Sequence, residues 1–109
     1  EDTPIGFAAV GEMDGEAYLA ELNVSLEHQG RGLGRQLIDQ ACVWARESGY
    51  RSMLLSTFRD IPWNAPYYAR QGFSPIDATE WHKPGIAAQR AHEARWHDLN
   101  RRVIMRKLL

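Results

Sequence analysis

Apolar and polar side chains first follow the pattern of a β-hairpin. Residues 5–13 are a mostly apolar run with small side chains, which predicts a strand. Asp14-Gly15 is a pair typical of a two-residue hairpin turn, so residues 16–25 are predicted to return as an antiparallel partner. One face of that second strand is predicted to carry Tyr18, Ala20, Leu22 and Val24, and the other face Leu19, Glu21, Asn23 and Ser25.

Residues 33–48 change to helical spacing. The apolar positions that recur there are Leu37, Ile38, Ala41, Trp44 and Ala45, and Gly49 is placed to end the helix. Residues 52–58 have an unbroken apolar centre, which predicts a strand buried on both faces. A strand, a helix and a second strand predict a parallel crossover in which the helix covers one face of the sheet.

The next stretch predicts a loop, a short helix and a strand. Residues 59–63 are the loop, and Asn64 is predicted to cap a helix that runs to about Gln71 and stops at Gly72. Residues 73–76 are then predicted to begin a strand.

The last part of the chain is more varied. Residues 77–100 contain a helix-prone stretch, 86–98, and residues 103–108 predict a closing strand. No internal repeat, low-complexity tract or linker interrupts the 109 residues, so 1–109 is predicted to be a single domain of mixed α/β type.

Composition and charge narrow the setting and the partners. Hydrophobic residues make up 44% of the chain and charged residues 25%, and the formal net charge of −1 indicates neither a nucleic-acid nor a membrane partner. No apolar run approaches the ~20 residues that span a bilayer, and no signal-peptide pattern opens the chain. The single cysteine, Cys42, lies in the helical pattern as a packing residue, and these features together favour a cytoplasmic protein. The first residue is Glu1 rather than Met, which indicates a fragment or a processed product.

Three glycines lie where the second strand gives way to the helix. Glycine lets a backbone approach a ligand closely, the first N–H groups of a helix lack intrahelical partners, and the helix dipole adds partial positive charge. This combination predicts an anion site suited to phosphate or pyrophosphate. The chain has neither the Lys-Ser/Thr of a P-loop nor the G-x-G-x-x-G of a dinucleotide site. The turn reads Gln29-Gly30-Arg31-Gly32-Leu33-Gly34 and is followed by Arg35-Gln36.

The turn does satisfy the pattern Gln/Arg-x-x-Gly-x-Gly/Ala, through Gln29, Gly32 and Gly34. This resembles the acetyl-CoA signature of the GNAT family of N-acetyltransferases. Residues 64–73, Asn-Ala-Pro-Tyr-Tyr-Ala-Arg-Gln-Gly-Phe, resemble the second signature of that family, N-x-x-(F/Y)-Y-x-x-x-G-F. Two signatures in the family's order are more specific than either one alone. On this resemblance the chain begins near the family's third strand and lacks its opening strand and pair of helices.

The resemblance implies an acyl-CoA N-acyltransferase-like α/β (α+β) fold, with a mixed sheet splayed near Val24 and acetyl-CoA as cosubstrate. It implies that the glycine turn holds the pyrophosphate and that the pantetheine arm runs beside Asn23 and Val24, where the Val24 N–H polarises the thioester carbonyl. Asn23 is alternatively an exposed polar strand residue, and Asn64 either caps its helix or contacts the pantetheine. The cofactor-binding residues expected in this way are Asn23, Val24, Gln29, Gly30, Arg31, Gly32, Leu33, Gly34, Arg35 and Asn64.

The resemblance also implies the catalytic residues. Tyr68 matches the tyrosine that protonates the departing thiolate, although it is alternatively an interfacial aromatic, and its neighbour Tyr67 is assigned to packing. Glu21 is either the general base, acting through a water, or a solvated or ion-paired strand residue. The implied reaction is direct attack by a primary amine on acetyl-CoA, because Cys42 lies too deep in the helical stripe to be a nucleophile. The histidines show no metal-ligand spacing, so no metal site is predicted.

Several alternatives stay open for the partners. The acceptor is expected to be a small-molecule or peptide amine, which the sequence does not identify. Residues 77–100, with Trp81 and Trp96, are predicted either to shape the choice of acceptor or to pack their helix onto the sheet. The alternative function is a CoA-binding or protein-interaction module without catalysis. An edge strand at residues 5–13 would also allow a homodimer.

Overall fold

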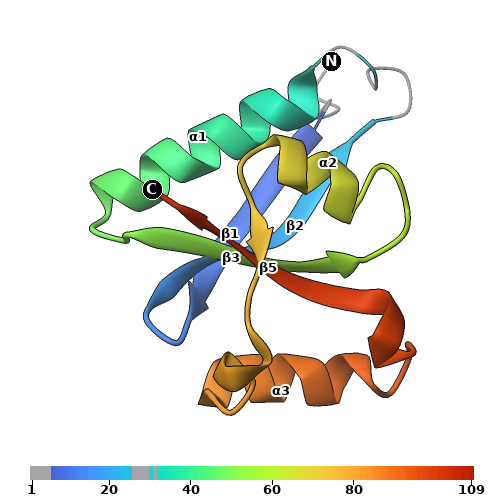
Figure 1. Cartoon of the computed structure of the whole chain (residues 1–109). Coiled ribbons are helices and arrows are strands. Elements are labelled where there is room, and N and C mark those ends of the chain that lie inside the picture. The colour runs from blue at the N-terminus through green and yellow to red at the C-terminus, as the bar shows by residue number, and fades with distance from the viewer. Residues whose placement is uncertain (1–5, 26–29, 31) are drawn as a thin grey trace.

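The computed structural model describes residues 6–25, 30 and 32–109. Within these residues a mixed five-stranded sheet, in the order β1-β2-β3-β5-β4, has helices on both faces (Figure 1). The strands are β1 (Gly6–Met13), β2 (Glu16–Val24), β3 (Ser52–Phe58), β4 (Ser74–Pro75) and β5 (Arg102–Leu108). The helices are α1 (Leu33–Glu47), α2 (Ala65–Arg70) and α3 (Pro84–Glu93), and short 3-10 turns occupy Ala78–Glu80 and Leu99–Arg101.

The pairing of the strands confirms the predicted hairpin and crossover. β1 and β2 are antiparallel and are joined by Asp14 and Gly15, whose φ angles of 53° and 82° suit a tight hairpin turn. β2 is parallel to β3, with α1 between them in the chain, and β5 is antiparallel to both β3 and β4. The predicted α/β fold with a mixed sheet is therefore correct.

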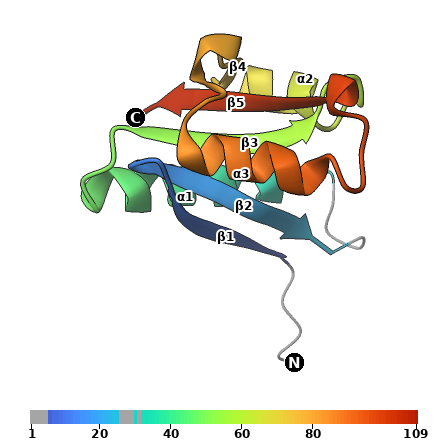
Figure 2. The ribbon, with the colours of Figure 1, turned by 90° about the horizontal axis from the view of Figure 1, so that it is seen from below.

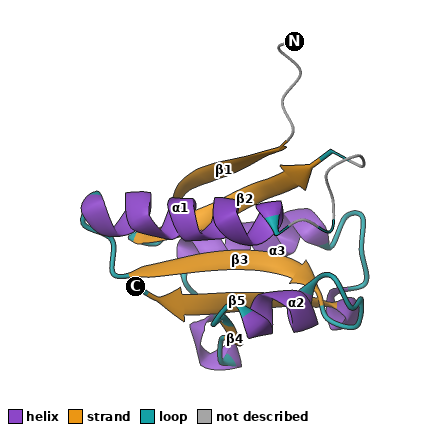
Figure 3. Cartoon of the chain, turned by 90° about the horizontal axis from the view of Figure 1, so that it is seen from above, coloured by secondary structure: helices purple, strands orange, loops and turns teal. Residues whose placement is uncertain are grey.

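The helices form a layer on each side of the sheet. α1 and α2 lie on one face and α3 lies on the opposite face, as two perpendicular views show (Figures 2 and 3). Met53 and Leu55 of β3 join the core beneath α1, whereas Leu54 joins the core beneath α3, because successive strand residues point to opposite faces. The prediction that this strand is buried on both faces is confirmed. The helical residues of the larger core are Ile38, Ala41, Cys42 and Ala45, and α3 contributes Ile86 to the smaller one.

A bulge in β2 makes the strict alternation predicted for this strand wrong. The register on either side of it pairs Ala9 with Glu21 and Val10 with Leu19. Ala20 is therefore an extra residue, and an extra residue reverses the direction of every side chain that follows it. Leu22 consequently shares the core beneath α1 with Leu19, whereas Tyr18 packs against the core beneath α3.

β2 and β3 separate early. Among the described residues of these two strands, only Ala17 pairs with Met53 and Tyr18 with Leu54, although both strands continue well beyond these pairs. In Figure 1 the two strands diverge beyond this point. The sheet is therefore splayed as predicted, but the separation begins far ahead of Val24.

The buried face of α1 differs from the predicted apolar face at one position. Trp44 was expected in the core, but it is 48% exposed and its ring lies beside Tyr50 at a centroid distance of 6.2 Å. Cys42 is buried there instead, as its expected packing role requires. Gly49 follows the helix with a φ of 97°, which confirms its predicted position at the helix end.

The helix predicted over residues 86–98 is observed earlier, as α3 at Pro84–Glu93. A residue distant in sequence caps its first N–H groups. The Asp14 carboxylate accepts hydrogen bonds from Gly85 N at 2.7 Å and from Ile86 N at 2.9 Å. The prediction that Trp81 and Trp96 pack this helix onto the sheet is wrong for Trp96, which is 72% exposed. Trp81 is 41% exposed and contacts α3 through Arg90, whose guanidinium lies 3.6 Å from the Trp81 ring centroid. Ile86 is the residue of α3 that fills the core against the sheet.

Candidate functional site

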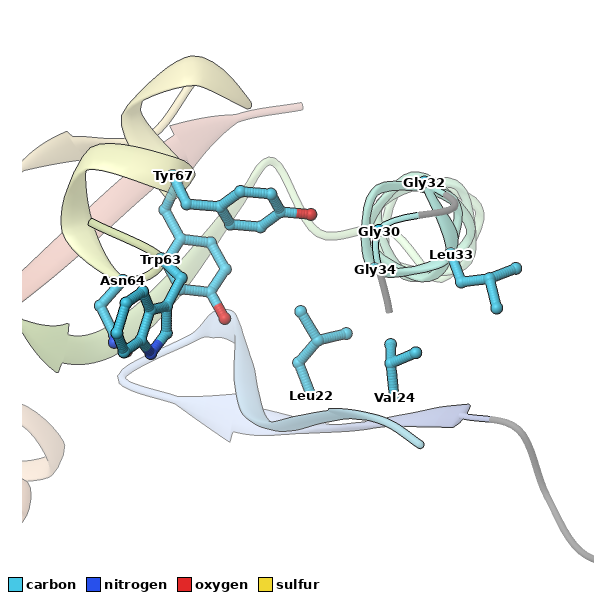
Figure 4. Close-up of a pocket in the computed structure, with 10 residues that line it drawn as sticks. Leu22, Val24, Gly30, Gly32, Leu33, Gly34, Trp63, Asn64 and Tyr67 are labelled. Atoms are coloured by element: carbon cyan, nitrogen blue, oxygen red, sulfur yellow. The ribbon is translucent and has the colours of Figure 1, made fainter. Parts of the chain in front are cut away.

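The separation of β2 and β3 lies beside a groove of about 770 Å³. The C-terminal half of β2 and the start of α1 form one wall, and α2 with the loop before it forms the other (Figure 4). No charged side chain is among the described residues of the lining, so the groove offers backbone groups, hydroxyls, one amide and apolar surface. These residues are Leu22, Val24, Gly30, Gly32, Leu33, Gly34, Trp63, Asn64, Tyr67 and Tyr68.

The N-terminus of α1 opens onto this groove without a side-chain cap. Gly32 occupies the N-cap position with a φ of 78°, a left-handed conformation that favours glycine, and no acidic residue lies in the first turn. The first N–H groups of a helix have no intrahelical partners, and the first described helical bond runs from Gln36 N to Gly32 O. This end of the groove can therefore hold an anion.

Asn64 does not cap α2 with its side chain, so that alternative is wrong. Its backbone carbonyl accepts from Tyr68 N at 2.9 Å, which places it at the N-cap position, but its side chain makes no capping bond. The Oδ1 atom instead accepts from the Thr57 hydroxyl at 2.7 Å. Thr57 is buried in β3, so the amide of Asn64 is held in the wall of the groove from behind.

Tyr68 brings a protected hydroxyl to the same wall. Its ring is partly buried and packs edge-on against Tyr67 and Phe73, at centroid distances of 5.4 and 5.9 Å. Burial, and to a smaller extent the neighbouring Tyr67, raises the pKa of the Tyr68 hydroxyl above its ordinary value of 10.0. The group is therefore protonated near neutral pH and can act as a proton donor.

Three residues of this site were not predicted from the sequence. Trp63 lines the groove with 73% of its surface exposed, and the ring of Tyr67 reaches toward the start of α1 (Figure 4). Leu22 also lines it, because the bulge turns this side chain toward α1. Trp63 could have been noticed in the sequence as an apolar aromatic in a loop next to Asn64.

The structure brings together most of the residues expected from the two signatures. The predicted residues that line the groove are Val24, Gly30, Gly32, Leu33, Gly34, Asn64 and Tyr68. Three others are exposed and lie outside its lining: Glu21, Asn23 and Arg35. Gln29 and Arg31 lie outside the described residues. Because Leu22 and Val24 point into the groove, the intervening Asn23 side chain points to the other face of β2.

A buried carboxylate lies away from the groove. Glu93, the last residue of α3, is 4% exposed and accepts hydrogen bonds from Ser56, Gln89 and Arg102. Burial alone would raise the pKa of this carboxyl, but the hydrogen bonds outweigh it and lower the pKa. Glu93 therefore joins α3 to the sheet as an ion-paired group. The described residues contain no cluster of His, Cys, Asp and Glu that could hold a metal ion.

A mixed sheet with a groove at its splayed strands, bounded by the glycine-rich start of a helix and by a tyrosine, defines an acyl-CoA N-acyltransferase-like α/β domain. The model of the Acetyltransferase (GNAT) family matches residues 1–73. The chain therefore belongs to the GNAT acetyltransferase family.

Relatives of this chain are longer than the chain itself. It is 34% identical over 74 residues to the uncharacterized N-acetyltransferase YobR of Bacillus subtilis, a match that covers 68% of this chain and 29% of that protein. The chain thus spans less than a third of this relative's length.

Solved structures share the fold. The N-acetylglutamate synthase of Neisseria gonorrhoeae, in complex with coenzyme A and N-acetyl-glutamate, is similar with a TM-score of 0.74, 19% identity and coverage of 96% of this chain and 23% of that one. Nourseothricin acetyltransferase is similar with a TM-score of 0.67, 23% identity and coverage of 95% and 57%. None of the helices in the described residues is long and apolar enough to cross a membrane.

Proposed function

We propose that this chain binds acetyl-CoA and forms the transfer site of an N-acetyltransferase that acts on a primary amine. The observation that carries the proposal is the groove, because it joins an uncapped helix N-terminus to the protected hydroxyl of Tyr68. An anion site at one end and a proton donor in the wall are what a phosphorylated thioester donor requires.

The residues present fit this cosubstrate. The N–H groups at the start of α1 would hold the pyrophosphate, and Gly30 and Gly32 leave open space where a side chain would otherwise begin. Arg35, in the first turn, would add positive charge from outside the lining. Leu22 and Val24 give the middle of the groove an apolar floor for the pantetheine arm.

Transfer would then proceed by direct attack. The amine nitrogen forms a bond to the thioester carbonyl carbon, the carbon–sulfur bond breaks, and the thiolate takes the proton of the Tyr68 hydroxyl. The backbone N–H of Val24 would polarise the carbonyl as charge develops on its oxygen. The nitrogen must also lose a proton, and Glu21, exposed just after the bulge in β2, is the candidate that would accept it through a water.

The acceptor is proposed only as a class, a small-molecule or peptide amine. The relatives named above are acetyltransferases or bind coenzyme A, which supports the class of reaction. The chain spans only part of each of them, so a module that binds CoA without transferring the acetyl group is the competing outcome.

Titration of the 109-residue chain with acetyl-CoA, with Gly32→Ala and Gly49→Ala alongside, tests the proposal. Both glycines have a positive φ, 78° and 97°, and both have open space around a new Cβ. The two variants should therefore lose similar stability, about 1–2 kcal/mol, from the strained backbone alone. Only Gly32 lines the groove, so only Gly32→Ala should weaken acetyl-CoA binding.

Release of free thiol from acetyl-CoA in the presence of a panel of amines then separates enzyme from module. Binding that Gly32→Ala weakens, together with amine-dependent thiol release, would support the transferase. Binding without release from any amine would favour the module. If the parent chain fails to bind acetyl-CoA, or if both glycine variants bind like the parent, the proposed site is wrong.

A further inference from the structure

Tyr67 reaches across the groove from α2 toward α1. Figure 4 shows its side chain extending toward the start of α1, with the hydroxyl near Gly34. A Cβ placed on Gly34 would lie 3.0 Å from the Tyr67 hydroxyl oxygen, which is tighter than about nine in ten real contacts of a Cβ. The hydroxyl therefore lies against the backbone of the first helical turn, where the unpaired N–H groups of the helix begin.

The surroundings of this hydroxyl suit an anion. Two cationic side chains from different helices flank Tyr67: Arg35 of α1 acts on it electrostatically, and the Arg70 guanidinium of α2 lies 5.9 Å from its ring centroid. The two arginines lower the pKa of the Tyr67 hydroxyl, whereas Asp39, on the same helix as Arg35, raises it. Burial raises the pKa of the hydroxyl more than the two arginines lower it, so the group remains a hydrogen-bond donor.

Packing alone does not account for the hydroxyl. A phenylalanine at position 67 would keep the ring contact with Tyr68 and the position beside Arg70. Among the described residues no group accepts a hydrogen bond from the Tyr67 hydroxyl. A partly buried donor that lines a groove and lacks a protein acceptor is available to a ligand.

We propose that Tyr67 is a phosphate-binding residue, whose hydroxyl donates a hydrogen bond to a pyrophosphate oxygen held at the N-terminus of α1. This assignment rests on the proposed binding of acetyl-CoA and extends it to a residue otherwise assigned to packing. It also gives a reason for glycine at position 34, since a larger residue there would displace the hydroxyl from the phosphate.

The test compares two thioesters that share the acetylated pantetheine arm, of which only acetyl-CoA also carries the pyrophosphate with its 3′-phosphoadenosine. Acetyl-CoA carries the pyrophosphate and S-acetylpantetheine lacks it, and NMR titration of the 109-residue chain measures both affinities. Tyr67→Phe should weaken acetyl-CoA binding about tenfold, the effect of losing one hydrogen bond to a charged group, and should leave S-acetylpantetheine binding unchanged. Tyr50→Phe is the matched control, because Tyr50 bonds Glu12 away from the groove, and its acetyl-CoA affinity should equal that of the parent.

Gly34→Ala adds a second, independent measurement. Alone it should weaken acetyl-CoA binding, because the new methyl group displaces the Tyr67 hydroxyl. In the Tyr67→Phe background the same change should cost much less, since the atom that clashes is gone, and the two losses would therefore be far from additive.

The outcomes separate this assignment from the function on which it rests. An unchanged acetyl-CoA affinity in Tyr67→Phe would overturn the assignment and leave the proposed function intact. An equal loss for both thioesters would also overturn it, because the hydroxyl would then serve the pantetheine arm. Additive losses in the double variant would contradict the contact between positions 34 and 67. A parent chain that does not bind acetyl-CoA would overturn both the function and the assignment.

Discussion

The hydroxyl of Thr57 donates a hydrogen bond to Oδ1 of Asn64 over 2.7 Å, and this bond fixes the wall of the groove to β3. Thr57 is only 4% exposed, so water cannot easily replace either partner. An Asn amide has a carbonyl oxygen and an NH₂ group, and occupation of the oxygen by Thr57 leaves the NH₂ group as the available donor. Asn64 should therefore present a donor to the carbonyl groups of a pantetheine arm.

Thr57→Val should disturb both stability and binding. Valine has nearly the same shape but cannot donate, so Oδ1 of Asn64 loses its partner, at a cost of about 1–2 kcal/mol in the free energy of unfolding. The freed amide can also rotate, which should raise the dissociation constant for acetyl-CoA. Urea unfolding and acetyl-CoA titration measure the two effects.

Thr57→Ser is the matched control, because serine keeps the hydroxyl and loses only a methyl group. It should bind acetyl-CoA like the parent chain. Equal affinities in the valine and serine variants would show that the orientation of Asn64 does not matter for binding.

Tyr68→Phe should separate chemistry from binding. The ring contacts with Tyr67 and Phe73 do not need the hydroxyl, so stability and acetyl-CoA affinity should change little. Loss of the proton donor should lower kcat by about 100-fold or more. Steady-state kinetics with an accepted amine, together with acetyl-CoA titration, make the comparison.

The pH dependence offers a second check on Tyr68. Burial and the neighbouring Tyr67 raise the pKa of this hydroxyl above 10.0, so it stays protonated through the neutral and mildly alkaline range. Deprotonation of Tyr68 should therefore cause no fall in kcat below about pH 10. A kcat for Tyr68→Phe equal to that of the parent chain would rule out Tyr68 as the proton donor.

The order of the elements could be predicted because local signals set most of their boundaries. The Asp14-Gly15 turn fixed the hairpin, and Gly49 ended α1 where the apolar spacing stopped. The bulge at Ala20 could not be predicted, because it appears only when β2 is paired with β1. The start of α3 also depends on a distant residue, since its cap comes from Asp14 across the fold.

Some residues of the candidate site could likewise be predicted from local sequence, whereas others depend on contacts between distant parts of the chain. The glycines at the start of α1 and Tyr68 belong to sequence signatures, and both line the groove. Thr57 could not be found from the sequence, because a buried strand threonine gives no sign of the side chain to which it donates. The position of the Tyr67 hydroxyl could not be predicted, because its approach to Gly34 depends on how α1 and α2 are placed across the groove.

The substitution Asp14→Gly should destabilise the chain, even though glycine suits the backbone conformation of the turn. Asp14 has a φ of 53°, which glycine adopts more easily, so the backbone should favour the substitution. The variant nevertheless loses the carboxylate that caps Gly85 and Ile86, and the net loss should be about 1 kcal/mol in the free energy of unfolding. Urea unfolding measures the loss, and hydrogen exchange at Ile86 should quicken.

Asp14→Asn keeps one acceptor oxygen and should be intermediate between parent and glycine variant. If Asp14→Gly unfolds at the same urea concentration as the parent chain and its Ile86 amide exchanges no faster, the long-range cap does not stabilise α3.

The ion-pair network around Arg106 should make the chain sensitive to acid. Arg106 bonds Glu16 through two nitrogens at 2.7 and 2.9 Å and also bonds Glu80, to which Lys83 donates at 2.9 Å. The hydrogen bonds from Arg106 and Lys83 lower the pKa of Glu80 from 4.5 to about 2. Burial would raise the pKa of Glu16, but the bonds from Arg106 and Ser52 outweigh it, so that pKa is lowered as well.

A lowered folded-state pKa means that the unfolded chain binds protons first as the pH falls. The stabilisation from Glu80 is therefore complete above about pH 4.5 and is lost progressively as the pH falls to about 2. Glu80→Gln should be less stable than the parent near neutral pH, by on the order of 1 kcal/mol because the carboxylate is partly exposed to water. Most of this difference should be lost as the pH approaches 2, where about half of the parent carboxyl groups are protonated. Thermal unfolding of both proteins between pH 7 and pH 2 measures it, and a difference that stays constant over this range would contradict the role given to the Glu80–Arg106 pair.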